Sequence, residues 1–554
     1  TRPRRPRQNL GIGPGHPPLQ QTRSRLGRDT RAVEQVLPAD RHPVEQAAPD
    51  AVARTLGRSP RLGQRAFGRQ HRVDPVAMLM GTTRVQIGLG QRDRIDLTPA
   101  YAASQLARAL PQPVVHIAPV APSCCRGGTL ATPRPMDNPR RGAIVRGMSH
   151  DADILIVGGG LNGPSLAIAL AKSGLRSIVI DALPEETRKG AEFDGRSYAL
   201  ALASVRMLGT LGLWDGLADD AQPILEIKAS DGRAGEGAAP HFLHFDHSEI
   251  EEGPMGHMIE DRYLRRSLLA AMEAEPLVTH MPGTKVVAQD TENGAVVTLD
   301  DGRRLTARLL VGADGRRSGT AERAGIRRTG WDYGQTALVC AIAHERPHDG
   351  IAHQFFMPGG PLAILPLPGN RSSIVWSERT ARAAEIAAMD DADYLDALRP
   401  AFGDFLGEIE LAGARYSYPL SLSMAEAFVA PRLALVGDAA HGVHPIAGQG
   451  LNLGLRDVAA LAEVLTDARR RGEDIAAPDV LARYQTWRRF DTTAMAVATD
   501  AFNRLFSNDN PLLRAVRDAG MGLVQATPAL RRRFIREAAG LTGDVPRLLQ
   551  GRAL

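Results

Sequence analysis

Short apolar runs recur along the chain after residue 150. Four of them, at 153–157, 177–180, 309–311 and 433–436, are each followed directly by glycine or aspartate. Apolar runs of this length without alternation are typical of strands that a parallel sheet buries on both faces. The helical pattern between the first two runs ends before Gly174, a favourable helix stop, so the pattern predicts a strand–helix–strand unit.

A different pattern occupies the middle of the chain. The runs 353–357, 362–365 and 372–376 are separated by Pro-Gly-Gly-Pro and Pro-Gly-Asn, which predicts an antiparallel meander. Further on, a stretch that begins near Leu451 carries apolar residues at helical spacing through Leu465, which predicts an amphipathic helix.

The first 147 residues follow neither pattern. They contain 24 arginines, no lysine and nine acidic residues, with frequent proline and glycine and no sustained periodicity. We expect this segment to be mostly disordered or a mis-assigned start, so that the working enzyme begins near Met148. An arginine-rich nucleic-acid arm, an organelle transit peptide and a regulatory tail are the alternatives.

Composition narrows the class of protein. Apolar residues make up 43% and charged residues 23% of the chain, as in ordinary globular proteins. Three cysteines, Cys124, Cys125 and Cys340, form neither a disulfide framework nor a metal-ligand spacing, so no metal is predicted. No apolar run approaches the roughly 18 residues of a membrane span.

The first strand leads into a dinucleotide-binding motif. Gly158, Gly160 and Gly163 match the G-x-G-x-x-G pattern, and Asp181 ends the second strand. The glycines would provide a tight turn, a close approach to a pyrophosphate and close helix packing. The helix N-terminus would attract the pyrophosphate, and Asp181 would accept hydrogen bonds from the adenosine ribose.

Two further motifs follow buried strands. Asp314 and Gly315 come after the run at 309–311, and Gly437 and Asp438 come after the last run. Ligands bind at the carboxyl ends of strands in open α/β sheets, and an acid there can hold ribose or ribityl hydroxyls.

In this order, the motifs resemble those of the flavoprotein aromatic hydroxylases, which are single-component FAD monooxygenases. The resemblance implies that Asp438 binds the ribityl chain of FAD and that Asp314 lies near the pyrophosphate and supports use of the nicotinamide cofactor. The segment 439–452 resembles the loop that lines the flavin ring in this family. The resemblance implies that Gly448, Gly450, Leu451 and Asn452 contact the cofactor and that His444 and Pro445 shape the pocket wall.

Several stretches resemble one branch, the ubiquinone-biosynthesis flavin hydroxylases. They are 194–200, 208–214, 360–367, 373–376 and 500–508. The resemblance covers nearly all of 150–520, and it implies that Arg196 and Arg262 contact the cofactor.

The resemblance also implies an α/β fold, in which a Rossmann-like FAD-binding domain is interleaved with a mixed or antiparallel substrate domain and followed by a helical C-terminus. The expected FAD-binding parts are 148–225, 255–330 and 429–500, the substrate-domain parts are 226–254 and 331–428, and the C-terminal helices are 501–554.

The implied reaction uses FAD, NADH or NADPH, and O2 to hydroxylate an aromatic small molecule, here a prenylated phenol of ubiquinone biosynthesis. We expect a cytoplasmic protein, peripheral at the inner membrane surface or in a biosynthetic complex, that binds no nucleic acid. The basic segment 530–536 could contact anionic lipid, although a solvated helix face explains it equally well.

Three alternatives stay open at this point. The enzyme could hydroxylate a soluble phenol, or it could be a flavin-dependent halogenase, although of its four lysines only Lys228 could lie near the pocket. A non-catalytic flavoprotein subunit of a biosynthetic assembly is the third.

Overall fold

The computed structural model describes residues 150–554, except 191, 194, 234, 236, 445–447 and 508–510. These residues belong to one compact unit. The expectation of disorder for residues 1–147 falls outside the described part of the chain. Among the described residues, none of the helices combines the length and the apolar character that crossing a bilayer requires.

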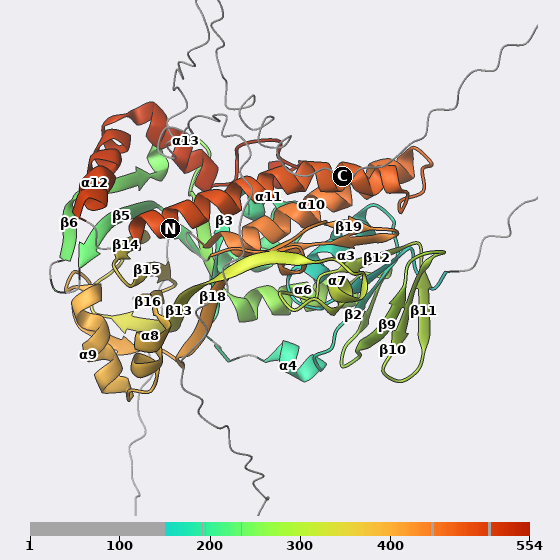
Figure 1. Ribbon diagram of the computed structural model, residues 1–554, viewed down its shortest axis with the longest axis horizontal. Coiled ribbons are helices and arrows are strands. Elements are labelled where there is room, and N and C mark those ends of the chain that lie inside the picture. Colours follow the sequence, from blue (N-terminus) through green and yellow to red (C-terminus); the bar gives the residue numbers. More distant parts are fainter. Residues whose placement is uncertain are drawn as a thin grey trace, which may run out of the picture. The chain divides into compact units, whose positions relative to one another are not determined.

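A mainly parallel sheet forms one half of the described part of the chain, with the strand order β19-β20-β12-β1-β2-β8 (Figure 1). The predicted strand–helix–strand unit is confirmed as β1, α3 and β2, and Gly174 ends α3 with a φ of 73°. The elements of this sheet and its first crossover are β1 (Ile154–Val157), α3 (Asn162–Lys172), β2 (Ser177–Ile180), β8 (Val278–Met281), β12 (Leu309–Gly312), β19 (Val429–Ala430) and β20 (Leu433–Leu435).

Helices and smaller sheets surround this parallel sheet. Helix α10 contacts both α3 and α11, and its buried residues share one hydrophobic core with β1, β2, β12 and β20. The bounds of these surrounding elements are α4 (Glu185–Lys189), β3 (Ser197–Ala201), α5 (Leu202–Thr210), β4 (Gln222–Ile224), β7 (Gly256–Glu260), α6 (Asp261–Ala274), β9 (Val286–Asp290), β10 (Ala295–Leu299), β11 (Arg304–Ala307), α7 (Gly319–Arg323) and α10 (Gln449–Arg470).

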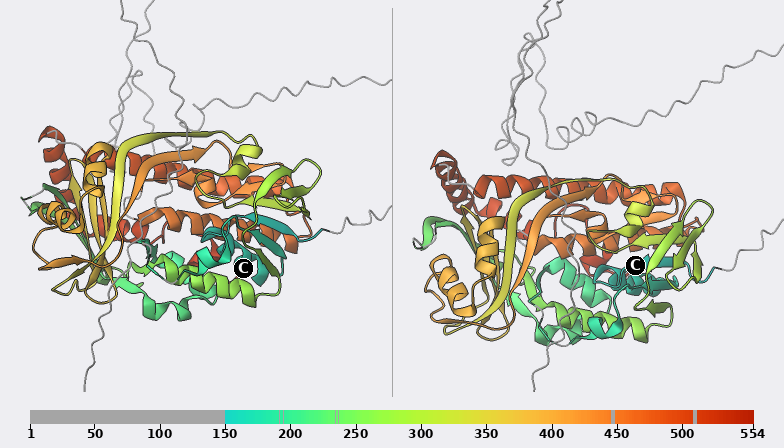
Figure 2. Two further views of the ribbon diagram at one scale, coloured as in Figure 1. Left: turned by 90° about the horizontal axis from the view of Figure 1, so that it is seen from below. Right: turned by 60° about the horizontal axis from the view of Figure 1, so that its bottom comes forward.

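A second, largely antiparallel sheet forms the other half, with the order β21-β18-β13-β16-β15-β14-β5-β6. The predicted meander is confirmed as β14, β15 and β16, which pair in antiparallel register. The long strands β13 and β18 run from the half that contains the parallel sheet into the half that contains the antiparallel sheet (Figure 2). The bounds are β5 (Glu226–Arg233), β6 (Gly237–Asp246), β13 (Arg328–His344), β14 (Ile351–Met357), β15 (Gly360–Leu367), β16 (Arg371–Arg379), α8 (Thr380–Ala387), α9 (Asp391–Phe402), β17 (Ile409–Leu411), β18 (Tyr416–Ala425) and β21 (His441–Gly442).

The C-terminal part is helical, as predicted. Helix α11 (Pro478–Phe506) is followed by α12 (Pro511–Ala526) and α13 (Pro528–Ala538). Arg517 of α12 donates from Nη2 to both carboxylate oxygens of Asp231 in β5, at 2.9 and 2.8 Å. Because both side chains are buried, this ion pair fixes α12 to the antiparallel sheet.

Candidate active site

The carboxyl ends of four parallel strands bring the sequence motifs to one edge of the sheet. Val157 is in register with Ile180 on one side and with Gly312 on the other, and Gly312 is in register with Leu435. The residues that follow these strand ends include the predicted site residues Gly158, Asp181, Asp314, Gly437 and Asp438. Motifs up to 280 positions apart therefore meet where an α/β sheet binds nucleotides.

Two glycines of the first motif are required by the protein's own packing. A Cβ at Gly158, which has a φ of 117°, would lie 2.3 Å from the carbonyl oxygen of Ala313. A Cβ at Gly163 would lie 2.0 Å from the carbonyl oxygen of Gly158, so α3 could not pack as closely on β1. These contacts agree with the tight turn and the close helix packing that the motif predicts.

Three other predicted cofactor glycines face open space instead. A Cβ at Gly160, Gly315 or Gly450 would meet no protein atom within 4 Å. Gly160 lies two residues before the first residue of α3, and Gly450 lies in the first turn of α10. An FAD molecule lying along this edge would use the space that these glycines leave, so the residues present fit the cofactor.

Asp181 is buried and already paired. Arg188 of α4 donates to both of its carboxylate oxygens, from Nε at 2.6 Å and from Nη2 at 3.0 Å. For Asp181 to accept hydrogen bonds from a ribose, as the motif predicts, the hydroxyls must share or replace this pairing. The pairing with Arg188 was not predicted from the sequence.

The two predicted carboxylates further along the chain, Asp314 and Asp438, differ in their hydrogen-bond partners and in their exposure. Asp314 accepts hydrogen bonds from the hydroxyl and backbone N–H of Thr320, both at 2.9 Å, and from Ser318. Its side chain therefore stabilises the turn that presents Gly315. Asp438 is 41% exposed and accepts from Nε of Arg316 at 3.2 Å. Of the two carboxylates, Asp438 is the more available to a ligand.

The predicted arginines lie at the start of α6: Arg262 is its second residue, and Arg196 contacts its first residue, Asp261. Arg196 pairs with the buried Asp261 at 3.0 Å, and Arg262 pairs with the buried Glu260 at 2.6 Å. Arg371 of β16 also contacts Glu260, at 3.1 Å, so residues of both halves meet here. With 41% and 26% of their side chains exposed, Arg196 and Arg262 retain surface for an anionic ligand. Their predicted cofactor contacts stay predictions.

The predicted flavin loop is braced by Asn452. Its Nδ2 donates to the carbonyl oxygens of Ala199 at 2.8 Å and Gly448 at 3.2 Å. Its Oδ1 accepts from the backbone N–H of Ala201 and from the hydroxyl of Ser204, both at 2.8 Å. The side chain of Asn452 thus holds the start of α10 against β3 and α5.

His444 is completely buried beside this loop. Its ring makes an edge contact with Tyr333 of β13, with centroids 5.0 Å apart. Burial, together with the charge of Arg316, lowers the pKa of His444 to about 4, so the ring is neutral at pH 7. Its neighbour Pro445 lies outside the residues that the structure describes.

Replacing His444 by glutamine is expected to change how stability depends on pH. The folded protein binds a proton at His444 only near pH 4, whereas the unfolded chain binds it near pH 6.5, so stability falls as the pH drops between these values. The loss attributable to His444 is on the order of 3 kcal/mol. Urea unfolding of both proteins at several pH values measures it, and parallel curves between pH 6.5 and 4 would contradict the prediction.

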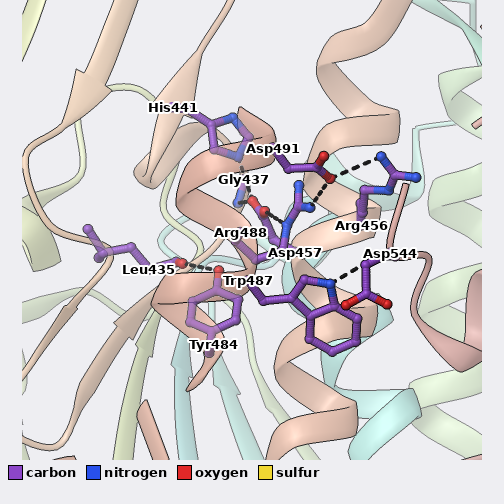
Figure 3. Close-up of polar contacts among 10 residues, drawn as sticks. All are labelled: Leu435, Gly437, His441, Arg456, Asp457, Tyr484, Trp487, Arg488, Asp491 and Asp544. Carbon is purple, nitrogen blue, oxygen red and sulfur yellow. Dashed lines mark hydrogen bonds and ion pairs between the residues drawn. The ribbon is translucent and has the colours of Figure 1, made fainter. Parts of the chain in front are cut away.

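A buried polar cluster that was not predicted from the sequence lies behind the Gly437–Asp438 turn (Figure 3). Asp457 of α10 contacts the turn, His441 and Arg488 of α11. A signal was present in the sequence. Asp457 lies three residues after Gly454 and four before Leu461, so it is an acid on an apolar face of a helix.

Away from this site, one group among the described residues has the geometry of metal ligands. Glu226, His244 and Asp246, on the β5–β6 hairpin, offer ligand atoms that all lie within 4.8 Å of one another. The Nζ of Lys228 lies 3.2 Å from Glu226, and His244 lies 2.8 Å from the same carboxylate. Because a lysine charge already compensates Glu226, we do not assign a metal here.

Comparisons with known proteins agree with this geometry. A family model described as an FAD binding domain matches residues 151–499. The ubiquinone hydroxylase UbiL of Rhodospirillum rubrum is 46% identical over 414 residues, which cover 74% of this chain and 95% of that protein. The 3-demethoxyubiquinol 3-hydroxylase of Escherichia coli is 36% identical over 396 residues, which cover 71% of this chain and 100% of that protein.

A solved structure supports the fold. The p-nitrophenol 4-monooxygenase PnpA from Pseudomonas putida superposes with a TM-score of 0.60 at 20% identity, covering 72% of this chain and 100% of that chain. The predicted fold class is therefore confirmed, and FAD is the cofactor that the matched domain binds. This chain belongs to the family of the ubiquinone-biosynthesis flavin hydroxylases and is an FAD-dependent monooxygenase of aromatic rings.

Proposed function

We propose that this enzyme hydroxylates the ring of a polyprenylated phenol on the way to ubiquinone, with O2 and with NADH or NADPH as the electron donor. The observation that carries the proposal is the similarity to UbiL, which extends over 95% of a protein named as a ubiquinone hydroxylase. The same similarity favours this substrate over a soluble phenol.

The residues at the strand ends have separate tasks in binding FAD. The space over Gly160 would admit the pyrophosphate to the N–H groups at the start of α3. Asp181 would accept from the adenosine ribose, and Asp438 from the ribityl hydroxyls. Arg196 and Arg262 would add positive charge beside the cofactor. When bound, FAD supplies the redox chemistry that activates oxygen for transfer to the ring.

The loop before α10 would bind the flavin ring. The N-terminus of α10, beginning at Gln449, carries partial positive charge and would stabilise negative charge on the reduced ring. Gly450 and Leu451 would approach the ring through backbone groups, and the neutral His444 would form part of the pocket wall. A buried, uncharged wall helps exclude water, which would otherwise compete with the aromatic substrate.

The nicotinamide cosubstrate would approach near Asp314 and Gly315. Arg316 follows them directly and keeps 44% of its side chain exposed, so it can contact a phosphate group.

We further propose that the enzyme works at a membrane surface or in a biosynthetic complex, where a prenylated ring would be presented. In α13, Arg531 and Arg536 are paired with Glu249 and Glu252. Arg532 and Arg533 are exposed and could face anionic headgroups.

The lipid profile of cells that lack this gene tests the substrate. Ubiquinone should fall, and an intermediate that lacks one hydroxyl should accumulate, because the ring cannot be oxidised at that carbon. Mass spectrometry of the quinone lipids measures both. An unchanged profile in cells without a redundant hydroxylase would refute the ubiquinone assignment and favour a soluble phenol.

Assays of the purified holoenzyme test whether NADH or NADPH is the electron donor and whether the enzyme acts at a membrane surface. Oxidation of NADH or NADPH should be stimulated by a prenylated phenol in anionic vesicles, with one oxygen added to the ring. Stimulation by a soluble phenol alone would argue against the membrane proposal. A flavoprotein without substrate-stimulated oxidation would be a non-catalytic subunit.

A further inference from the structure

We propose that Asp457 is the positioning residue for the ribityl-binding turn: it holds the Gly437–Asp438 backbone in the shape that binds FAD, although its side chain lies behind the turn. This inference rests on the proposed cofactor contact of Asp438, and it does not depend on which phenol is the substrate.

The contacts of Asp457 connect α10 to the turn. Its Oδ2 accepts from the backbone N–H of Gly437 at 3.0 Å and from Nε2 of His441 at 2.5 Å. The turn is thereby held at its first residue and again at His441, three residues after Asp438. A shift of this carboxylate would move both sides of the residue proposed to bind the ribityl chain.

The same carboxylate is fixed from the opposite side. Arg488 of α11, which is fully buried, donates from Nε to Oδ1 of Asp457 at 2.8 Å. Burial opposes ionisation of Asp457, but the charges of His441 and Arg488 hold its pKa below the usual range. The carboxylate therefore stays ionised and presents a charged acceptor to the Gly437 N–H, which gives a stronger hydrogen bond than a neutral acceptor.

The turn requires glycine and is held from a second helix. Gly437 has a φ of 59°, and a Cβ there would lie 2.1 Å from Nδ2 of Asn162. Two residues before Gly437, the carbonyl oxygen of Leu435 accepts from the hydroxyl of Tyr484 at 2.7 Å. Figure 3 shows that Asp457 and Tyr484 reach this segment from two different helices, α10 and α11. The backbone that presents Asp438 is thus held by side chains that are not themselves exposed at the proposed FAD site.

A matched pair of variants separates positioning from general stabilisation. Asp457→Asn removes the charge that holds the turn. Asp491→Asn removes a carboxylate that pairs with the same Arg488 at 2.7 Å and with Arg456 at 3.1 Å. These two ion pairs of Asp491 do not involve the turn. FAD is titrated into both full-length apoproteins and the wild type, with quenching of flavin fluorescence as the readout. Thermal unfolding of each apoprotein is recorded beside it.

Asp457→Asn should weaken FAD binding by roughly tenfold or more, because the amide is uncharged and has only one oxygen to accept from both the Gly437 N–H and Arg488. It should also alter the visible spectrum of the bound flavin. Asp491→Asn should bind FAD within about twofold of the wild type, even where its unfolding temperature falls.

Asp457→Glu covers the case in which the amide variant does not fold. It keeps the buried charge opposite Arg488 but adds a methylene, which displaces the carboxylate from Gly437. FAD binding should again weaken. Wild-type affinity in Asp457→Glu, or equal losses in Asp457→Asn and Asp491→Asn, would overturn the proposal. Since the titration needs no substrate, failure of the ubiquinone assignment would leave this result unaffected.

Discussion

Alanine at position 160 is expected to abolish retention of FAD while the apoprotein folds normally. A Cβ there meets no protein atom within 4 Å, and Gly160 does not need a positive φ. The methyl group would instead occupy the space proposed for the pyrophosphate. Crowding and the loss of N–H contacts together should weaken binding roughly 100-fold or more. Flavin content after gel filtration and FAD titration of the apoprotein measure the effect.

Gly163→Ala is the matched control from the same motif. Its Cβ would lie 2.0 Å from the carbonyl oxygen of Gly158, so α3 must shift whether or not FAD is bound. The apoprotein itself should lose about 1–3 kcal/mol of stability. Normal FAD binding by Gly160→Ala would show that the pyrophosphate does not lie over Gly160.

Replacing Arg517 by methionine is expected to destabilise the protein by about 3–5 kcal/mol, because the buried carboxylate of Asp231 loses its partner. The Arg517 and Asp231 side chains are only 2% and 3% exposed, so water cannot replace the lost hydrogen bonds. The guanidinium also donates to the carbonyl oxygen of Leu505 at 2.9 Å, which ties α12 to the end of α11. Urea unfolding, followed by circular dichroism, measures the change.

A double variant shows whether the uncompensated charge is the cause. Asp231→Leu combined with Arg517→Met removes both charges and should recover most of the lost stability. If the double variant is as unstable as Arg517→Met alone, the hydrogen bond of Arg517 to the carbonyl oxygen of Leu505, rather than the ion pair, holds α12 in place.

Local patterns in the sequence were sufficient to predict the elements that carry the cofactor site. The strand Ser177–Ile180 has the predicted bounds, and the meander was recognised from its turn residues. Parallel strands expose their carboxyl ends at a common edge, so the motifs after Val157 and Gly312 could be expected to meet without knowledge of the tertiary structure. The family resemblance rested on the same local motifs. The division into domains and the cofactor contacts of individual residues stay predictions.

The sequence by itself thus determined the class of fold, the position of the nucleotide edge and the glycines around it, because these depend on periodicity and on backbone geometry over a few residues. Only the tertiary structure decided which charged side chains meet. Asp181 pairs with Arg188, and Asp457 lies between His441 and Arg488, which are 16 residues before it and 31 residues after it. Such partners are chosen by how helices and loops pack, since a buried charge must find a counter-charge wherever the fold places one, and no local pattern records that choice.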